Sequence, residues 1–243
     1  MSPPALPVLD RATVDRWRST WDEVMAGFLP GAASLEEALP AVVEAACAGC
    51  PRRILDLGGG PGVFAERMAG RWPGADVAML DLDPVLLALA DAGAGGRIRV
   101  HCADLASGRS LPGGPYDLLT MVMTIHYLSS EQALALYRAA RRALRPGGLL
   151  IVADLMPEPG LDRVMAHLQP AAGPAWASWW DGLHAEESLR PLLDERRAVF
   201  AGRAPAEFAP PADWHRAAAL DAGFDQAGVV WRWGAHAALA AIA

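Results

Sequence analysis

Apolar residues recur along this chain in two alternating patterns. Short runs that are almost entirely aliphatic predict buried strands, and longer segments with apolar residues three and four positions apart predict amphipathic helices. In chain order, the predicted elements up to residue 154 are helices at 10–28 and from Ser34 onward, strand 53–57, helix 63–72, strand 76–80, helix 85–92, strands 97–102 and 116–121, helix 131–144 and strand 149–154.

Strands that alternate with helices favour a parallel sheet covered on both faces, and the handedness of the crossovers makes it doubly wound. The pattern changes over residues 156–213, which are rich in Pro, Ala and Trp and predict two or three helices. A short helix then runs from Trp214 to Gly223. The last two predicted strands, 226–232 and 235–242, are so close in sequence that they form a hairpin, so one of them runs antiparallel.

The predicted fold class is therefore α/β, with a doubly wound, mostly parallel seven-stranded sheet, an antiparallel strand in a C-terminal hairpin, and a helical cap. We divide the chain into N-terminal helices that contribute to the cap (1–50), a sheet domain (51–155 and 214–243) and a cap insertion (156–213).

Helix-start signals mark two of the predicted helices. Ser34, followed three residues later by Glu37, predicts a capping box. Asp83, directly before Pro84, predicts a helix N-cap with proline in the first turn.

A glycine-rich loop follows the first predicted strand, in the run Asp56-Leu57-Gly58-Gly59-Gly60-Pro61-Gly62. Glycines let the backbone turn tightly and approach a ligand at the carboxyl edge of the sheet, where open α/β proteins bind ligands. The spacing disfavours a NAD(P) site, because a dinucleotide fingerprint counted from Gly58 would need glycine where Val63 stands. The Asp56 carboxylate would repel a pyrophosphate and attract a cation or an amine.

This loop resembles motif I of the class I S-adenosylmethionine (SAM)-dependent methyltransferases, of the small-molecule type. The likeness covers about residues 54–154 and 214–242. Further segments match the family in order, namely Asp81 after the second strand, Asp104 after the third, Tyr116–Leu119, Ile125–Leu128, Leu144–Gly148 and Ala222–Phe224.

The resemblance implies that SAM is the cofactor and assigns a role to each matching position. Asp81 would accept the two ribose hydroxyls, and Asp104 with the Leu105 backbone would contact adenine. Leu82 and Met123 would surround the adenine or the thioether. The implied cofactor-binding residues are Asp56, Gly58, Gly59, Gly60, Asp81, Leu82, Asp104, Leu105 and Met123.

Two residues are candidates for catalysis of methyl transfer. His126 aligns with the turn in which small-molecule O-methyltransferases place a catalytic histidine, although its neighbour here is Tyr127 in place of Asp. Asp154, at the carboxyl end of the fifth strand, is a candidate base or substrate anchor. A purely structural role stays open for both.

Tryptophan is abundant where the acceptor would bind. A pocket walled by indole rings suits a planar or hydrophobic acceptor, although the same rings could simply join the cap to the sheet. The candidate acceptor-binding residues are His126, Tyr127, Trp17, Trp21, Trp176, Trp180, His184 and His215. Three arginines of the predicted cap could grip a carboxylate but are expected on a solvated helix face, namely Arg190, Arg196 and Arg197.

Composition narrows the function further. A net charge of −7 disfavours nucleic acid as a partner. No apolar run approaches the length of a membrane span, residues 1–10 do not resemble a signal peptide, and three cysteines favour a reducing compartment, so we expect a cytoplasmic protein. The chain has no Lys, which excludes Schiff-base chemistry. Cys47 and Cys50, with one other cysteine, do not predict a metal site.

The sequence thus predicts a SAM-dependent methyltransferase that acts on a small, mainly apolar acceptor, most readily at a hydroxyl, as a monomer or homodimer. Two alternatives stay open. The first is a protein of the same fold that binds SAM without methylating anything. The second is a methyltransferase that acts on a macromolecule.

Overall fold

The computed structural model describes residues 9–168, 173–203 and 208–243. The expectation that residues 1–10 do not resemble a signal peptide concerns mainly residues 1–8, which lie outside this part. A single sheet forms the centre of the described molecule, with strand order β3-β2-β1-β4-β5-β7-β6. Its strands are β1 (Arg53–Leu57), β2 (Asp76–Asp81), β3 (Arg99–Cys102), β4 (Tyr116–Val122), β5 (Leu144–Leu155), β6 (Gln226–Trp233) and β7 (His236–Ile242).

Strands β1 to β5 pair in parallel, and β7 inserts antiparallel between β5 and β6. The predicted fold class is therefore confirmed. The chain order runs outward in opposite directions from β1 and β4, which lie side by side. The carboxyl ends of these two strands form the switch point where ligands bind in open α/β sheets.

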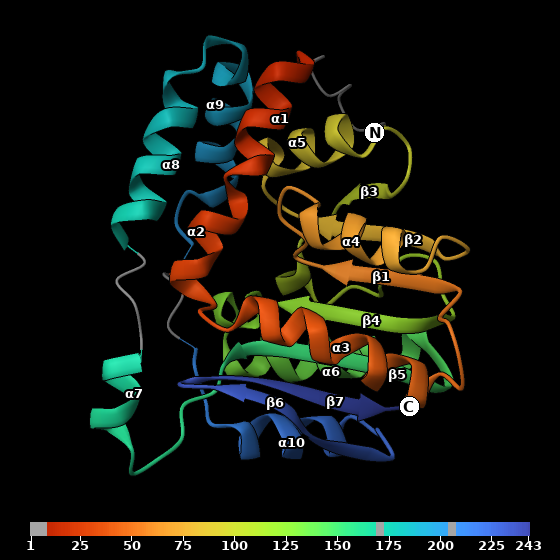
Figure 1. Cartoon of the computed structure of the whole chain (residues 1–243). Coiled ribbons are helices and arrows are strands. Elements are labelled where there is room, and N and C mark those ends of the chain that lie inside the picture. The colour runs from red at the N-terminus through yellow and green to blue at the C-terminus, as the bar shows by residue number, and fades with distance from the viewer. Residues whose placement is uncertain (1–8, 169–172, 204–207) are drawn as a thin grey trace.

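Helices cover both faces of the sheet (Figure 1). One face packs against α3 (Ala32–Ala46), α4 (Val63–Arg71) and α5 (Pro84–Ala94). The other face packs against α6 (Ser130–Ala143) and α10 (Ala212–Asp221). Aliphatic side chains alternate between the two layers along β1, β2, β4, β5 and β7, which is why these strands are mostly apolar.

A third apolar layer lies beyond the carboxyl ends of the parallel strands, where Figure 1 shows N-terminal and cap helices side by side. It contains α1 (Arg11–Ser19), α2 (Trp21–Phe28), α8 (Gly173–Ala185) and α9 (Arg190–Phe200). The predicted helices between residues 156 and 213 are present in the described residues and include α7 (Asp162–Leu168). No helix of the described residues is long and apolar enough to cross a membrane.

Two boundaries differ from the sequence prediction. The helix expected over 10–28 breaks at Thr20, whose hydroxyl donates to the Arg16 carbonyl and accepts the indole N–H of Trp179. This bond to a distant helix was invisible in the local pattern. The strand expected at 149–154 already begins at Leu144, which pairs with Tyr116, so the predicted turn at 145–148 is an irregularity within β5.

The predicted capping box at Ser34 is wrong. α3 begins earlier, after Gly31, and the Ser34 hydroxyl donates to the Gly31 carbonyl inside the first turn. Gly31 is buried against Trp231 and Trp233 of β6, so packing against the last hairpin sets where this helix starts. The predicted N-cap at Asp83 is confirmed, because its carboxylate accepts the backbone N–H groups of the first turn of α5.

Packing between α1 and α8 gives a first prediction. The Trp17 ring occupies the space where a side chain at Gly182 would stand. We expect Gly182→Ala to lower the free energy of unfolding by about 1–3 kcal/mol, because the ring must move. Gly70→Ala in α4 is the matched control, since its added methyl meets nothing closer than 3.8 Å, and helix propensity should raise stability by about 0.5–1 kcal/mol. Urea denaturation of both variants measures the difference, and equal effects would contradict the packing role.

Candidate functional site

The glycine loop lies at the carboxyl end of β1 and packs directly on the turn that follows β4. Gly58 and Gly60 have φ angles of 72° and 57°, in the left-handed region that favours glycine. The Gly58 and Gly59 N–H groups donate to the Leu80 carbonyl at 2.8 and 3.0 Å, which ties the loop to β2. A side chain at Gly58 would collide with Thr124. The missing Cβ therefore lets the loop approach the turn that carries His126.

Asp56 points beneath the loop and is buried. Its Oδ1 accepts a hydrogen bond of 2.6 Å from the Thr120 hydroxyl. Burial raises the pKa of Asp56 to about 7, against the hydrogen bond from Thr120, which lowers it, and the charge of Asp81 adds to the increase. This carboxyl is thus poised to ionise when a cation comes near the loop.

Asp81, at the end of β2, joins the loop to the start of α5. Its Oδ2 accepts the Gly60 N–H at 2.8 Å, and its Oδ1 accepts the N–H groups of Leu82 and Asp83 at 2.7 and 2.9 Å. Burial raises the pKa of Asp81, and the backbone N–H groups oppose that increase. Among the described residues, Oδ2 accepts only the Gly60 N–H and keeps acceptor capacity for a further donor, so this acid fits a ribose hydroxyl.

Asp104 follows β3 and starts a short 3-10 helix, η1 (Leu105–Ser107). Its Oδ1 accepts the Ala106 N–H at 2.9 Å, and its Oδ2 accepts the Arg203 guanidinium at 2.7 Å. The hydrogen bond from Arg203 holds the pKa of Asp104 below its usual value. Leu105 is half-buried beside it. The structure therefore places Asp104 at the predicted strand end and adds a cationic neighbour from the segment after α9.

The turn after β4 carries the candidate base. Met123 has a φ of 51°, which is unusual for a residue with a side chain and marks a strained position of the kind found at functional sites. A 3-10 helix, η2 (Ile125–Tyr127), follows it. The His126 Nδ1 lies 2.7 Å from the Asp154 Oδ1, and the His126 side chain is 13% exposed.

Asp154 lies under this turn and is 1% exposed. Its Oδ2 accepts the N–H groups of Thr124 and Ile125, both at 2.9 Å, and its Oδ1 accepts the Leu155 N–H at 2.7 Å in addition to the His126 ring. Protein donors therefore surround this carboxylate. The geometry fits a residue that orients His126, and it leaves Asp154 no open face for direct contact with an acceptor.

Two further aromatic rings lie near His126. Tyr127 is 59% exposed, and its ring centroid is 4.3 Å from that of His126. His236, at the start of β7, is buried, and its pKa is lowered by burial and by the nearby His126, against opposing effects of Asp154 and the Phe28 backbone. His236 had no distinguishing sequence signal, because β7 approaches the turn only in the folded sheet.

The predicted tryptophans gather in one cluster between α1, α2 and α8. The ring centroids of Trp21 lie 6.2 Å from Trp176 and 5.2 Å from Trp179, and Phe28 lies 5.4 Å from Trp176. Trp180 is buried and lies under the Arg196 guanidinium at 3.8 Å. Part of this cluster therefore joins the cap to α2. Trp17, Trp21 and Trp176 are only partly buried, but Trp17 packs on Trp179 and its indole N–H donates to Glu186, so Trp21 and Trp176 are the rings we retain as acceptor candidates.

The other predicted acceptor residues lie elsewhere. His184 is exposed on α8, where its Nδ1 lies 2.7 Å from the Trp180 carbonyl. His215 is fully buried between α10 and α6 with its Nδ1 2.9 Å from the Tyr137 hydroxyl, and burial lowers its pKa to about 4. The structure thus makes His215 part of the core, and we do not retain it as an acceptor residue.

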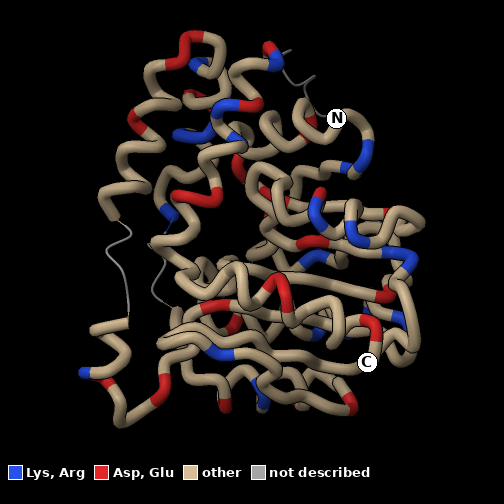
Figure 2. Tube along the Cα trace, viewed as in Figure 1, with Lys and Arg blue, Asp and Glu red and all other residues tan. Residues whose placement is uncertain are grey.

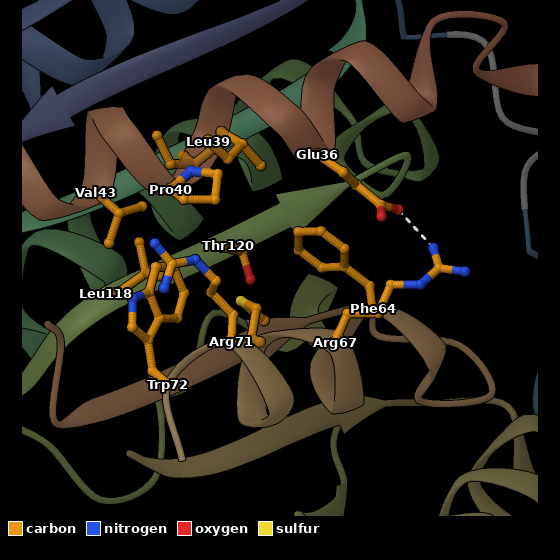
Figure 3. Close-up of a pocket in the computed structure, with 12 residues that line it drawn as sticks. Glu36, Leu39, Pro40, Val43, Phe64, Arg67, Arg71, Trp72, Leu118 and Thr120 are labelled. Carbon is orange, nitrogen blue, oxygen red and sulfur yellow. Dashed lines mark hydrogen bonds and ion pairs between the residues drawn. The ribbon is translucent and has the colours of Figure 1, made fainter. Parts of the chain in front are cut away.

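An apolar hollow of about 120 Å³ lies between α3 and α4, away from the cap (Figure 3). Leu39, Val43 and Phe64 line it, and at its rim Glu36 accepts a hydrogen bond of 2.5 Å from Arg67. Its polar floor is Thr120, whose hydroxyl already donates to Asp56. This hollow lacks the base and the free acids that chemistry would need, so the candidate site is the carboxyl edge.

Several contacts at this edge were missed or misjudged from sequence. Thr120 and Thr124 carry no motif, yet one bonds to Asp56 and the other packs on Gly58. The expectation that Arg196 lies on a solvated face is wrong, because its Nε donates to the Asp83 carboxylate at 2.5 Å. Spacing alone could not reveal these contacts, since each joins residues that are far apart in the chain.

Comparison with known proteins finds relatives of the central part of this chain. Residues 54–148 match the family model described as a methyltransferase domain. The chain is 37% identical to the demethylmenaquinone methyltransferase of Thermus thermophilus over 48% of this chain and 53% of that protein. This chain is also 31% identical to the acetylserotonin O-methyltransferase of Mus musculus, over 45% of this chain and 30% of that protein.

A solved structure extends the likeness beyond this segment. The S-adenosylmethionine-dependent methyltransferase SibL is 25% identical and superposes with a TM-score of 0.53, over 79% of this chain and 50% of that chain. The chain thus spans about half the length, or less, of these relatives.

The buried Asp56 gives a prediction on stability. Its pKa is about 7 in the folded protein and near 3.8 in the unfolded chain, so folding binds extra protons between these values and the free energy of unfolding falls as pH rises from about 4 to 7. Asp56→Asn removes this loss and keeps the acceptor for Thr120. We expect its Tm to exceed that of the parent at pH 8 by at least about 2 °C, with a smaller difference at pH 5.

Asp117→Asn is the control for the sign of this effect. Although burial acts to raise it, hydrogen bonds from Arg145, Arg53 and Arg52 hold the pKa of Asp117 below its usual value. The ionised carboxylate therefore stabilises the fold above its unfolded pKa, and this variant should melt at a lower temperature at pH 8. A Tm of Asp56→Asn at or below that of the parent at pH 8, measured by calorimetry, would refute the assigned burial effect.

Proposed function

We propose that this chain is a class I SAM-dependent methyltransferase that transfers the methyl group of SAM to a hydroxyl of a small, mainly apolar acceptor. One observation carries the proposal: an Asp154-oriented histidine lies on a turn that packs against the glycine loop. The donor-binding and proton-accepting parts of a methyl-transfer site therefore meet at one sheet edge.

SAM, when bound, supplies a sulfonium that carries an activated methyl group. The residues of this edge fit its other groups. The Oδ2 of Asp81 has acceptor capacity for a ribose hydroxyl, Asp104 lies at the next strand end for the adenine amino group, and Asp56 offers a carboxyl for the ammonium. The left-handed glycines at positions 58 and 60 bring bare backbone against the methionine portion.

His126 would act as the general base for a hydroxyl acceptor. With Nδ1–H donated to Asp154, the neutral ring would present Nε2 with a free lone pair, able to accept the proton of an acceptor hydroxyl. Asp154 fixes the tautomer and the ring plane, as the acid does in other Asp–His pairs. Positioning of the two reactants supplies the rest of the rate gain.

The acceptor would bind between Tyr127 and the cluster formed by Trp21, Trp176 and Phe28. Aromatic walls of this kind favour a planar or apolar molecule and exclude water from the reacting atoms. We propose that α1, α2, α8 and α9 form the acceptor-side cap. Acidic and basic segments are interspersed along the described trace (Figure 2), which suits a small molecule better than a polyanion such as RNA.

Relatives support this class of reaction. They include an O-methyltransferase that takes its name from acetylserotonin and a methyltransferase named for demethylmenaquinone, and both names refer to small molecules.

We also propose that the protein is cytoplasmic, because the free thiols of Cys47, Cys50 and Cys102 fit a reducing compartment.

The test is direct. The purified protein is titrated with S-adenosylhomocysteine (SAH), the product form of the cofactor, in a calorimeter. It is then incubated with methyl-labelled SAM and a panel of phenols, aliphatic alcohols and amines. We expect SAH binding and label transfer to at least one hydroxyl acceptor. Binding without transfer to any acceptor would favour a non-methylating SAM protein, and no binding would refute the proposal.

Asp81 gives a prediction on cofactor affinity. Asp81→Ala should weaken SAH binding by about 1.5–3 kcal/mol, because it removes a charged acceptor from the ribose. Isothermal titration calorimetry measures this change. Glu131→Ala, which removes an exposed acid from the first turn of α6, is the control and should leave affinity unchanged. Equal affinity of Asp81→Ala and the parent would contradict the ribose role.

His126 gives a prediction on turnover. His126→Gln should lower kcat by about 10²–10⁴-fold with a hydroxyl acceptor, because the base is lost, while SAH affinity stays within about twofold. His101→Gln, at an exposed position on β3, is the matched control and should keep full activity. Unchanged kcat in His126→Gln would show that His126 only supports the turn.

A further inference from the structure

The N-terminal helix pair contacts the glycine loop itself as well as the cap. Arg18, near the end of α1, donates from its Nε to the Pro61 carbonyl at 2.9 Å and from Nη2 to the Glu66 carboxylate at 2.6 Å. Its side chain is only 10% exposed. One guanidinium therefore bridges the backbone of the loop and the first turn of α4, the helix that follows it.

The space for Arg18 is provided by a glycine on another helix. A side chain at Gly93 of α5 would overlap the Arg18 guanidinium. Arg18 is thus inserted between α5 and the loop, where burial strengthens its two hydrogen bonds relative to a surface pair. A lysine could hold the charge near Glu66, but its single ammonium lacks the fork that binds both partners at once.

A second contact joins the same helix pair to the loop. A Cβ at Gly60 would stand 3.2 Å from the Trp21 Cζ2, so the indole of α2 lies against the bare loop backbone. Trp21 also packs on Trp176 and Trp179 of α8. The loop is therefore held on its outer side by Arg18 and Trp21, and the second of these belongs to the proposed acceptor wall.

We propose that Arg18 is a positioning residue for the cofactor: it fixes the glycine loop through the Pro61 carbonyl in the form that accepts SAM. This inference rests on the proposed function. Arg18 touches neither the reacting atoms nor, through its two hydrogen bonds, any of the cofactor-binding residues; it acts through the loop backbone. Its removal should therefore change cofactor affinity more than the turnover of the saturated enzyme.

The experiment compares four variants in SAH calorimetry, thermal melting and, with any acceptor found, steady-state kinetics. Arg18→Met should weaken SAH binding by roughly tenfold and raise the KM for SAM similarly, with kcat within about threefold. Arg18→Lys should keep most of the Tm through Glu66 and still lose affinity. Glu66→Gln, which keeps the Pro61 bond, should bind SAH nearly as the parent does.

Arg16→Met is the matched control. Arg16 lies on the same helix and pairs with Glu186 at the surface, without contact to the loop. It should leave SAH affinity unchanged. If Arg18→Met and Arg18→Lys lower the Tm but bind SAH as the parent does, Arg18 is only structural and the inference is wrong. If the parent protein itself binds no SAH, the proposed function fails instead, so the two failures are distinguishable.

Discussion

The site depends on one buried carboxylate that the protein surrounds with donors. Asp154 accepts three backbone N–H groups and the His126 ring, and it is almost fully shielded from solvent. Removing a charge from water is costly unless its hydrogen bonds are made, and here they are made by the same turn that presents the histidine. The turn after β4 is therefore held to the end of β5, and the orientation of His126 follows from that attachment.

The glycine loop takes its position from this turn. Gly58 has no side chain, so the loop can lie against Thr124, and Asp81 closes it from the other side through the Gly60 N–H. The glycine loop, Asp81, Thr124, Asp154 and His126 thus form one continuous hydrogen-bonded edge between β2, β1, β4 and β5. The buried Asp56 destabilises the fold when it ionises. Proteins retain such destabilising groups mainly at functional sites, where a bound ligand can offset the cost.

The helices beyond the sheet belong to the same unit. The Trp17 ring packs against the bare backbone of Gly182, and Trp21 packs on Gly60. The Trp179 indole N–H donates to the Thr20 hydroxyl. Segments at opposite ends of the chain therefore wall the space above the glycine loop. A movement of α8 would displace Trp21, and a change in the glycine loop would displace Arg18. The contacts are close-packed, so the two partners cannot move independently.

The sequence by itself determined the α/β fold, because strand runs and helical periods are local and the hairpin length forces an antiparallel strand. It also located the glycine loop and Asp83 as a cap, since these follow from residue type and position along one segment, whereas the turn that carries His126 was located by resemblance to the methyltransferases. Only the tertiary structure decided that Asp154 orients His126 rather than facing an acceptor, that His215 is in the core, and that Ser34 does not cap its helix. It also brought Arg18 to Pro61 and Arg196 to Asp83. The physical reason is that these outcomes depend on burial and on hydrogen bonds between distant segments. The sheet order decides which segments come into contact, and the local sequence of either segment does not encode that order.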